Sequence, residues 1–341
     1  MTQYSITRRQ LLSAIPALAL QSRAPAQPGK APIRVWSLSH MTLTVSDRKR
    51  SVEFYQGLFG LPVQHHQDIS TGLRIGPGLQ YISLSQGGPN ATPKIAHFCM
   101  TVEHFSVNGV TQALAGHGVT KGDPGPLKTW VRTRGPNAGG AAEGTPELYV
   151  GDPDGINVQL QDVSYCGGGG VLGNVCKPIE PAPTKGLIAL RDLSHFTLGV
   201  SDPQRSMAFY QDLFGMPIQA RQGVTPLLAV GSKKQFITLA GMNAAPGRAP
   251  SIAHGCFTME GFNPDKVLKA LADYGIKPRG DSSGPAGPLV SYVTMRMENR
   301  GGAKGGTPEL YFTDPDGILM QIQDVSYCGG AGYLGEVCSA S

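Results

Sequence analysis

The chain has 341 residues, with 46 glycines, 27 prolines and a formal net charge of +5 at pH 7. This length suits about two ordinary domains, each long enough to bury its own core. The many turn-forming residues and the modest charge favour short strands joined by turns over a mainly helical or disordered chain.

The N-terminal segment has the layout of an export signal. Arg8 and Arg9 precede an uncharged stretch at residues 11–20, and Ala24-Pro25-Ala26 then offers a small-residue cleavage site. This order is typical of a bacterial twin-arginine signal, so we expect cleavage of residues 1–26 and a periplasmic or secreted protein. The alternative is a basic tail on a cytosolic protein. The apolar stretch is too short to stay in a bilayer, and we expect no integral membrane segment after cleavage.

Cleavage would also remove most of the positive charge. Residues 1–26 hold three arginines and no acidic residue, so the formal net charge would fall to +5 − 3 = +2. So small a charge offers no basic surface for nucleic acid, and we expect none as a partner.

The first domain opens with a predicted strand and a predicted helix. Residues 38–45 alternate apolar and polar side chains, which predicts a half-buried strand. Ser46-Asp47 caps a helix that ends at Gly60. Short strands then follow near residue 63, at 73–75 and at 80–84.

The same order restarts after a turn at residues 87–89. Residues 95–102 predict a strand and residues 107–115 a helix. An Asp-Pro-Asp-Gly turn at residues 152–155 then joins the last two strands. The pattern predicts two β-α-β-β-β units in this part of the chain.

Two Gly-rich loops are each framed by a pair of cysteines. Cys166 and Cys176 frame the first loop, and Cys328 and Cys338 frame the second. An oxidising compartment would favour one small disulfide closing each loop. The alternative is a pair of C-x9-C metal sites, but no histidine or further cysteine lies nearby in the sequence, which favours the disulfides.

The chain repeats itself. Residues 145–166 and 307–328 align without a gap and are identical at 17 of 22 positions. Upstream, Leu-Ser-His at 38–40 returns at 193–195, and Ile-Ala-His at 95–97 returns at 252–254. Such repetition indicates two tandem copies of one domain. The expected organisation is the signal at 1–26, domain 1 at 33–166, a Gly/Cys loop and Pro-rich linker at 167–189, domain 2 at 190–328, and a Gly/Cys loop tail at 329–341.

These features together resemble the vicinal oxygen chelate (VOC) superfamily of glyoxalases, bleomycin-resistance proteins and extradiol dioxygenases. The resemblance rests on the paired units, the leading Ser-His strand, the Phe-Tyr-Gln-x-Leu-Phe-Gly helix end at 54–60 and the Asp-Pro-Asp-Gly hairpin, and it covers nearly all of residues 35–165 and 190–327. It implies an α+β fold of two tandem VOC domains. Each domain would be built from two βαβββ units that form a curved, cup-like mixed sheet with helices outside.

Strand parity indicates which side chains would face the cup. Successive side chains on a strand point to opposite faces, so if the apolar ones pack on the helices, His40 and Thr42 turn inward. The same rule turns His97 and Cys99 inward on the next strand, and Gln159 on the last. The second copy repeats the pattern with His195, Thr197, His254, Cys256 and Gln321.

The resemblance also implies a metal on the concave face, held by one His from the first strand, one from the strand that opens the second unit, and a Glu from the last. His40 and His97 match the first two positions, but the third is Gln159; the second copy offers His195, His254 and Gln321. A neutral amide would bind Fe, Mn, Zn or Ni more weakly than a carboxylate, which disfavours Fe(II) ring cleavage without excluding a metal.

Cys99 and Cys256 offer one source of the missing negative charge. A thiolate two residues from a ligand His, on the same face, would suit a soft or borderline metal. The alternative is a small buried cysteine that fills the cup floor. Four histidines without a counterpart in the other copy are expected at the surface: His65, His66, His104 and His117.

Glu147 and Glu309 are second-rank candidates to supply the negative charge that the glutamines lack. A plain four-residue turn at 152–155 would pair Gln159 with Leu148 and turn Glu147 away from the cup. A β-bulge would reverse this parity.

Two functions stay open at this point. The first is a metal-dependent enzyme, extradiol dioxygenase-like or glyoxalase/lyase-like, acting on a small substrate with vicinal oxygens. The alternative is a metal-free protein that binds and sequesters a small molecule, as bleomycin-resistance proteins do. The sequence leaves open whether the two copies pair with each other or with another chain as an oligomer.

Overall fold

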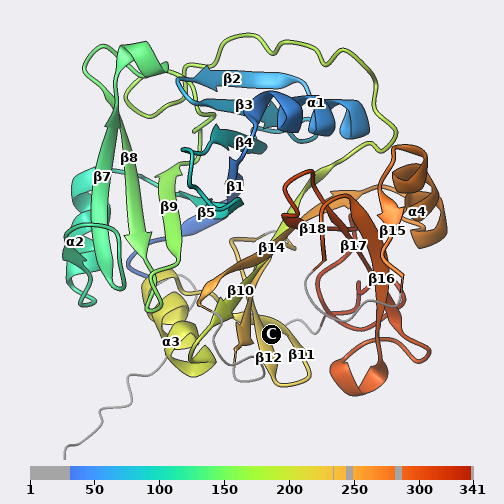
Figure 1. The fold of residues 1–341 in the computed structure, drawn as a ribbon. Helices are drawn as coiled ribbons and strands as arrows, with labels where there is room; N and C mark the ends of the chain where they lie inside the picture. Colours follow the sequence, from blue (N-terminus) through green and yellow to red (C-terminus); the bar gives the residue numbers. More distant parts are fainter. Residues whose placement is uncertain (1–30, 233, 243–248, 281–285, 339–341) are drawn as a thin grey trace, which may run out of the picture.

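A computed structural model describes residues 31–232, 234–242, 249–280 and 286–338 (Figure 1). The expected export signal at residues 1–26 lies outside the described residues. Within the described residues, no helix is long and apolar enough to cross a membrane.

The first copy folds into one nine-stranded sheet with the order β2-β3-β4-β1-β5-β9-β8-β7-β6. Its first unit consists of β1 (Val35–Val45), α1 (Arg48–Phe59), β2 (Val63–Gln67), β3 (Ser70–Arg74) and β4 (Tyr81–Gln86). Its second unit consists of β5 (Lys94–Val102), α2 (Val107–Ala115), β6 (Thr120–Lys121), β7 (Lys128–Arg134), the 3-10 helix η1 (Pro136–Ala138), β8 (Thr145–Gly151) and β9 (Asn157–Asp162). The two units join where β1 runs antiparallel to β5.

The second copy repeats this sheet strand for strand. Its first unit consists of β10 (Asp192–Val200), α3 (Pro203–Phe214), β11 (Ile218–Gln222), β12 (Thr225–Ala229) and β13 (Phe236–Gly241). Its second unit consists of β14 (Ser251–Met259), α4 (Pro264–Asp273), β15 (Lys277–Pro278), β16 (Val290–Arg296), the 3-10 helix η2 (Glu298–Arg300), β17 (Thr307–Thr313) and β18 (Leu319–Asp324). The predicted α+β fold of two tandem domains is confirmed, with β6 and β15 as short additional strands.

The predicted helix signals set the ends of α1. The Asp47 side chain accepts a hydrogen bond from the backbone N–H of Arg50, which satisfies one of the unpaired donors at the helix start. Gly60 ends the helix with a φ of 65°, a left-handed conformation that glycine adopts at little cost. α1 therefore begins and ends where the sequence predicts.

The two copies pack against each other through a shared apolar core. Buried apolar residues from both copies belong to one continuous cluster. At its centre Phe98 of β5 stacks on Phe196 of β10, with ring centroids 5.0 Å apart. Burial of this joint core favours the two copies as one unit.

The Asp-Pro-Asp-Gly turn of each copy also binds the first helix of the other. Asp152 accepts a hydrogen bond from the Tyr210 hydroxyl at 3.2 Å, and Asp314 accepts one from the Tyr55 hydroxyl at 3.3 Å. The second aspartate of each turn forms an ion pair on the same helix: Asp154 with Arg205, and Asp316 with Arg50. The copies therefore pair with each other within the chain, which the sequence left open.

The register of the last hairpin differs from the expected one. Gln159 lies opposite Tyr149 rather than Leu148. The N–H of Asp152 donates to the carbonyl of Ile156 at 3.0 Å, and Gly155 is left-handed, with a φ of 80°. The loop therefore has three residues, 153–155, rather than the two that a plain four-residue turn would leave. This extra residue shifts the pairing of the two strands by one position. As a result Glu147 lies on the same face of the sheet as Gln159.

Candidate functional site

The two histidines and the glutamine of the first copy come together inside its cup. β1 and β5 place Thr42 opposite His97, and β5 and β9 place Cys99 opposite Gln159. Nε2 of His40 lies 3.1 Å from Oε1 of Gln159. The rings of His40 and His97 meet edge to face, with centroids 5.7 Å apart.

The second copy brings its three equivalent side chains together, but here the glutamine contacts the histidine of β14 rather than that of the first strand. Nε2 of His254 lies 3.1 Å from Oε1 of Gln321, and the rings of His195 and His254 are 5.6 Å apart. The Thr197 hydroxyl lies 3.2 Å from Nε2 of His254. A cavity of about 140 Å³ opens here, and both histidines, Thr197 and Gln321 line it together with Glu309 and Tyr311.

Burial keeps all four histidines uncharged at neutral pH. It lowers the pKa of His97 and of His254 to about 4. It also lowers the pKa of His40 and of His195 well below 6.5, and the neighbouring histidine in each cup adds to this effect. A neutral imidazole keeps a ring nitrogen lone pair with which it can bind a metal or accept a hydrogen bond.

The donor set of each cup fits a divalent metal of the borderline class. Imidazole nitrogens suit Zn, Fe and Ni, and an amide oxygen can complete such a site. Nε2 of His97 is buried without a hydrogen-bond partner, which is costly for a polar atom and leaves it available to a ligand. Within the described ranges, no group of three or more His, Cys, Asp or Glu side chains is placed so that it could hold a metal, and the third partner in each cup is a glutamine.

The two buried cysteines are neutral thiols in the protein alone. Cys99 and Cys256 are fully buried, and each thiol lies against the backbone carbonyl of the next residue, at 3.6 and 3.4 Å. Burial raises the pKa of both thiols well above 9. Neither therefore carries a negative charge at neutral pH without a metal to stabilise it.

Glu147 and Glu309 face the cups but are held by buried arginines. Nε of Arg134 donates to Glu147 at 2.8 Å, and Nε of Arg296 donates to Glu309 at 2.7 Å. Both guanidinium groups have no exposed surface. The sequence analysis missed these arginines, although each stands 11 residues before the repeated Thr-Pro-Glu-Leu-Tyr segment in its copy.

A tyrosine next to each disulfide completes the cup floor. The Tyr165 hydroxyl donates to Glu147 at 3.1 Å, and the Tyr327 hydroxyl donates to Glu309 at 3.2 Å. Their rings stack near His40 and His195, with centroids 5.8 and 5.7 Å apart. The Gly-rich loops therefore begin directly under the histidines.

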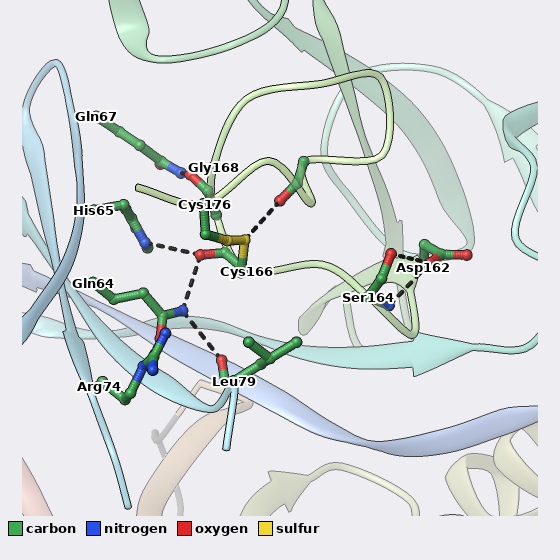
Figure 2. The surroundings of a disulfide bond; sticks show 12 residues. Gln64, His65, Gln67, Arg74, Leu79, Asp162, Ser164, Cys166, Gly168 and Cys176 are labelled. Atoms are coloured by element: carbon green, nitrogen blue, oxygen red, sulfur yellow. Dashed lines mark hydrogen bonds between the residues drawn. A yellow bond between two sulfur atoms is a disulfide. The ribbon is translucent and has the colours of Figure 1, made fainter. Parts of the chain in front are cut away.

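Both predicted disulfides are present, Cys166–Cys176 and Cys328–Cys338. Figure 2 shows that side chains of β2 bind the start of the first loop: the carbonyl of Cys166 accepts from the amide of Gln64 at 2.9 Å and lies 3.1 Å from Nδ1 of His65. From the other side, Arg134 donates to the carbonyl of Gly168 at 2.8 Å. The loop thus spans from β2 to β7, which lie far apart in the sheet order.

The expectation that His65 lies at the surface is wrong. Its side chain is buried, and burial lowers its pKa to about 3. It packs over Gly72, where an added Cβ would lie 2.2 Å from the ring. In the second copy, Ala220 stands at the position of His65 and Leu227 at the position of Gly72. The large side chain therefore comes from the opposite strand of the pair.

Comparisons with known proteins agree with this architecture. The family model described as "Glyoxalase/Bleomycin resistance protein/Dioxygenase superfamily" matches residues 37–160 and 192–322. Among curated proteins, glutathione transferase FosA from Serratia marcescens is 30% identical over 129 residues, which cover 36% of this chain and 79% of that protein. Its alignment therefore spans about one copy.

Similar solved structures span both copies. Homoprotocatechuate 2,3-dioxygenase from Arthrobacter globiformis has a TM-score of 0.57 and 21% identity, over 88% of this chain and 82% of that chain. The Mn(II)-bound glyoxalase from Novosphingobium aromaticivorans has a TM-score of 0.57 and 15% identity, over 85% of this chain and 82% of that chain. At these identities the likeness is one of fold.

Proposed function

Because the chain belongs to the Glyoxalase/Bleomycin resistance protein/Dioxygenase superfamily, we propose that it is a metal-dependent enzyme acting on a small molecule with vicinal oxygens. The observation that carries this proposal is the meeting of two buried, neutral histidines and a glutamine in each cup. The Mn(II)-bound glyoxalase and the homoprotocatechuate 2,3-dioxygenase among the structural relatives support it.

In the second cup, Nε2 of His195, Nε2 of His254 and Oε1 of Gln321 would hold the metal. When bound, a divalent metal would polarise the substrate oxygens. Tyr311 lines the same cavity, and burial raises the pKa of its hydroxyl well above 10. It therefore stays protonated and can donate a hydrogen bond to a substrate oxygen in place of the one it gives Glu309 at 3.4 Å.

The neutral amide favours glyoxalase-like or lyase-like chemistry over extradiol ring cleavage. Two histidines and one carboxylate are the usual facial site of Fe(II) oxygenases, and this chain lacks the carboxylate in both copies. Fe, Mn, Zn and Ni all remain candidate metals. The substrate is a small molecule in each case.

A second candidate function is metal-free binding of a small molecule, as in a sequestering protein. The observation in its favour is that Glu147 and Glu309, which face the cups, are engaged by Arg134 and Arg296. Their charges are therefore already neutralised within the protein.

Elemental analysis of protein purified without chelator separates the two functions. We expect about one or two equivalents of Fe, Mn, Zn or Ni in the wild type and loss of this metal in a His97→Ala, His254→Ala double variant. His66→Ala, which removes an exposed imidazole, serves as the matched control and should keep the metal. Absence of metal from the wild type, with none taken up on addition, would leave the binding function.

We also propose that the protein is exported through the twin-arginine route. The two disulfides support this, because such bonds persist in oxidising compartments. Replacement of Arg8 and Arg9 by lysine should shift the protein from the periplasmic to the cytoplasmic fraction of an expressing bacterium. An unchanged distribution would contradict export by this route.

A further inference from the structure

The cavity of the second cup contains one charged group that the protein itself does not neutralise. Of the side chains that line the cavity, Arg300 and Glu309 are the charged ones at neutral pH. Glu309 is paired with Arg296 at 2.7 Å and also accepts from two tyrosine hydroxyls. Among the described residues, Arg300 has no ion-pair partner.

Besides the buried Arg134, the first cup has a second arginine, Arg132, which does not lie at the position equivalent to Arg300. There Arg132 of β7 lies 3.8 Å from Glu147, and its charge helps to lower the pKa of His97. In the second copy the equivalent position is Thr294, whereas the first copy has Ala138 at the position of Arg300. Arg132 is thus bound to the glutamate, while Arg300 stands on η2 at the wall of the cavity.

The size and lining of the cavity limit what can bind there. Its volume of about 140 Å³ is below the roughly 300 Å³ at which pockets for drug-sized ligands begin, so it suits a smaller molecule. The hydroxyls of Thr197, Thr225 and Thr238 line it, so the wall is rich in hydrogen-bonding groups. A guanidinium group binds planar oxyanions through two parallel hydrogen bonds.

We propose that the second cup binds a small oxyanion, such as a hydroxy carboxylate, whose anionic group is held by Arg300 while a neighbouring oxygen faces His195, His254 and Gln321. This inference rests on the proposed function, since it names the substrate class for the same site. The neutral donor set strengthens the inference. Two imidazoles and an amide add no negative charge to a divalent metal, so the metal would attract an anionic ligand.

Two matched probes test the inference. Glycolate and glycolamide have the same number of heavy atoms and the same hydroxyl next to a carbonyl carbon, but one is an anion and the other is neutral. Each is 13C-labelled and titrated by NMR into the Zn²⁺-loaded full-length protein and into protein in EDTA. We expect glycolate to bind the loaded protein ~10-fold more tightly than glycolamide, as a charge-assisted contact would provide.

Variants assign the preference to one side chain. Arg300→Gln should remove most of the preference for glycolate and leave only the part that the charge of the metal provides, and Arg300→Lys should keep a larger part of it. Arg132→Gln is the matched control in the first cup and should leave the preference unchanged. Raised salt should weaken glycolate binding in the wild type but not glycolamide binding, because Arg300 is exposed to solvent.

The failures of the two proposals are distinguishable. If Zn²⁺ binds but glycolate fails to bind, binds no better than glycolamide, or keeps its full preference in Arg300→Gln, the inference is wrong and the metal proposal stands. If Zn²⁺ does not bind the wild type, the metal proposal fails. In that case a glycolate preference in EDTA that Arg300→Gln abolishes still supports the anion site, and its absence overturns it.

Discussion

Glu309→Gln removes one charge from the buried ion pair under the second cup. Nε of Arg296 donates to the Glu309 carboxylate at 2.7 Å, and the two side chains have 0% and 8% of their surface exposed. After the change, an amide oxygen could still accept from Nε of Arg296, and the carbonyls of Gly301 and Gly330 would stay as partners, but no negative charge would face the guanidinium. Leaving one partner of a buried pair uncompensated costs about 3–5 kcal/mol.

This cost is a large share of the ~5–15 kcal/mol by which a folded domain is stable. Urea unfolding followed by circular dichroism should show it as a lower midpoint at pH 7. Glu298→Gln, an exposed change on η2, is the control and should stay within ~0.5 kcal/mol of the wild type. The double variant Arg296→Met, Glu309→Gln should recover most of the loss, because no unpaired charge remains.

A loss of less than ~1 kcal/mol in Glu309→Gln would refute the structural role given to this pair. The same variant also tests whether Glu309 is a metal ligand. Since Arg296 and two tyrosines hold its carboxylate, we expect Glu309→Gln to keep its metal where the protein stays folded. Unchanged stability together with loss of metal would make Glu309 a ligand instead.

Three further changes follow from the same contacts. Gln321→Glu should tighten Zn²⁺ binding in calorimetry by ~10-fold or more, because it adds an anion to a neutral donor set; equal affinity would argue against Gln321 as a ligand. Cys328→Ser with Cys338→Ser should lower the free energy of unfolding by about 3 kcal/mol, since the bond closes a loop with a sequence separation of 10; no change in the urea midpoint would contradict this. Metal-free protein in chelator should lose stability as the pH falls from 6.5 towards 5. Burial lowers the pKa of His97 and His254 to about 4, so the unfolded chain binds more protons across this window. At ~1.4 kcal/mol per pKa unit, the lowered pKa of each of these two histidines reduces the free energy of unfolding by about 2 kcal/mol at pH 5. His40, His65 and His195 act in the same direction. Burial raises the pKa of Asp152 and of Asp314 to about 6, which has the opposite effect. Each aspartate adds about 1.4 kcal/mol to the free energy of unfolding at pH 5. A free energy of unfolding at pH 5 equal to or above that at pH 6.5 would contradict this prediction.

Strand parity predicted the centre of each cup from the sequence. The alternation of side chains along β1 and β5 depends only on local backbone geometry, so it placed His40 and His97 on one face. The repeat supplied a second instance of the same arrangement in His195 and His254. The fold class followed from the repeat and from the resemblance.

The register of the last hairpin could not be predicted in this way. It depends on whether Gly155 adopts a left-handed conformation, and a change of one residue in the loop moves Glu147 to the other face. His65 was misplaced for a related reason. Its burial depends on the space left by Gly72, a neighbour on the adjacent strand that parity along one strand does not reveal.

The contacts between the copies were also beyond the sequence analysis. Asp152 and Asp154 belong to an Asp-Pro-Asp-Gly turn. The turn alone accounts for their spacing, so the sequence gives no sign that they bind another part of the chain. Their second role, on Tyr210 and Arg205 of the other copy, depends on how the two sheets pack. Asp314 and Asp316 have the same second role on Tyr55 and Arg50, so the two copies use the turn reciprocally.

The most direct test of the account is a crystal structure of the Zn²⁺-loaded protein with data collected at the zinc absorption edge. We predict an anomalous peak within bonding distance of Nε2 of His195, Nε2 of His254 and Oε1 of Gln321, and an equivalent peak at His40, His97 and Gln159 if both cups bind metal. Peaks elsewhere only, or none in a crystal grown with excess Zn²⁺, would contradict the proposed metal centre.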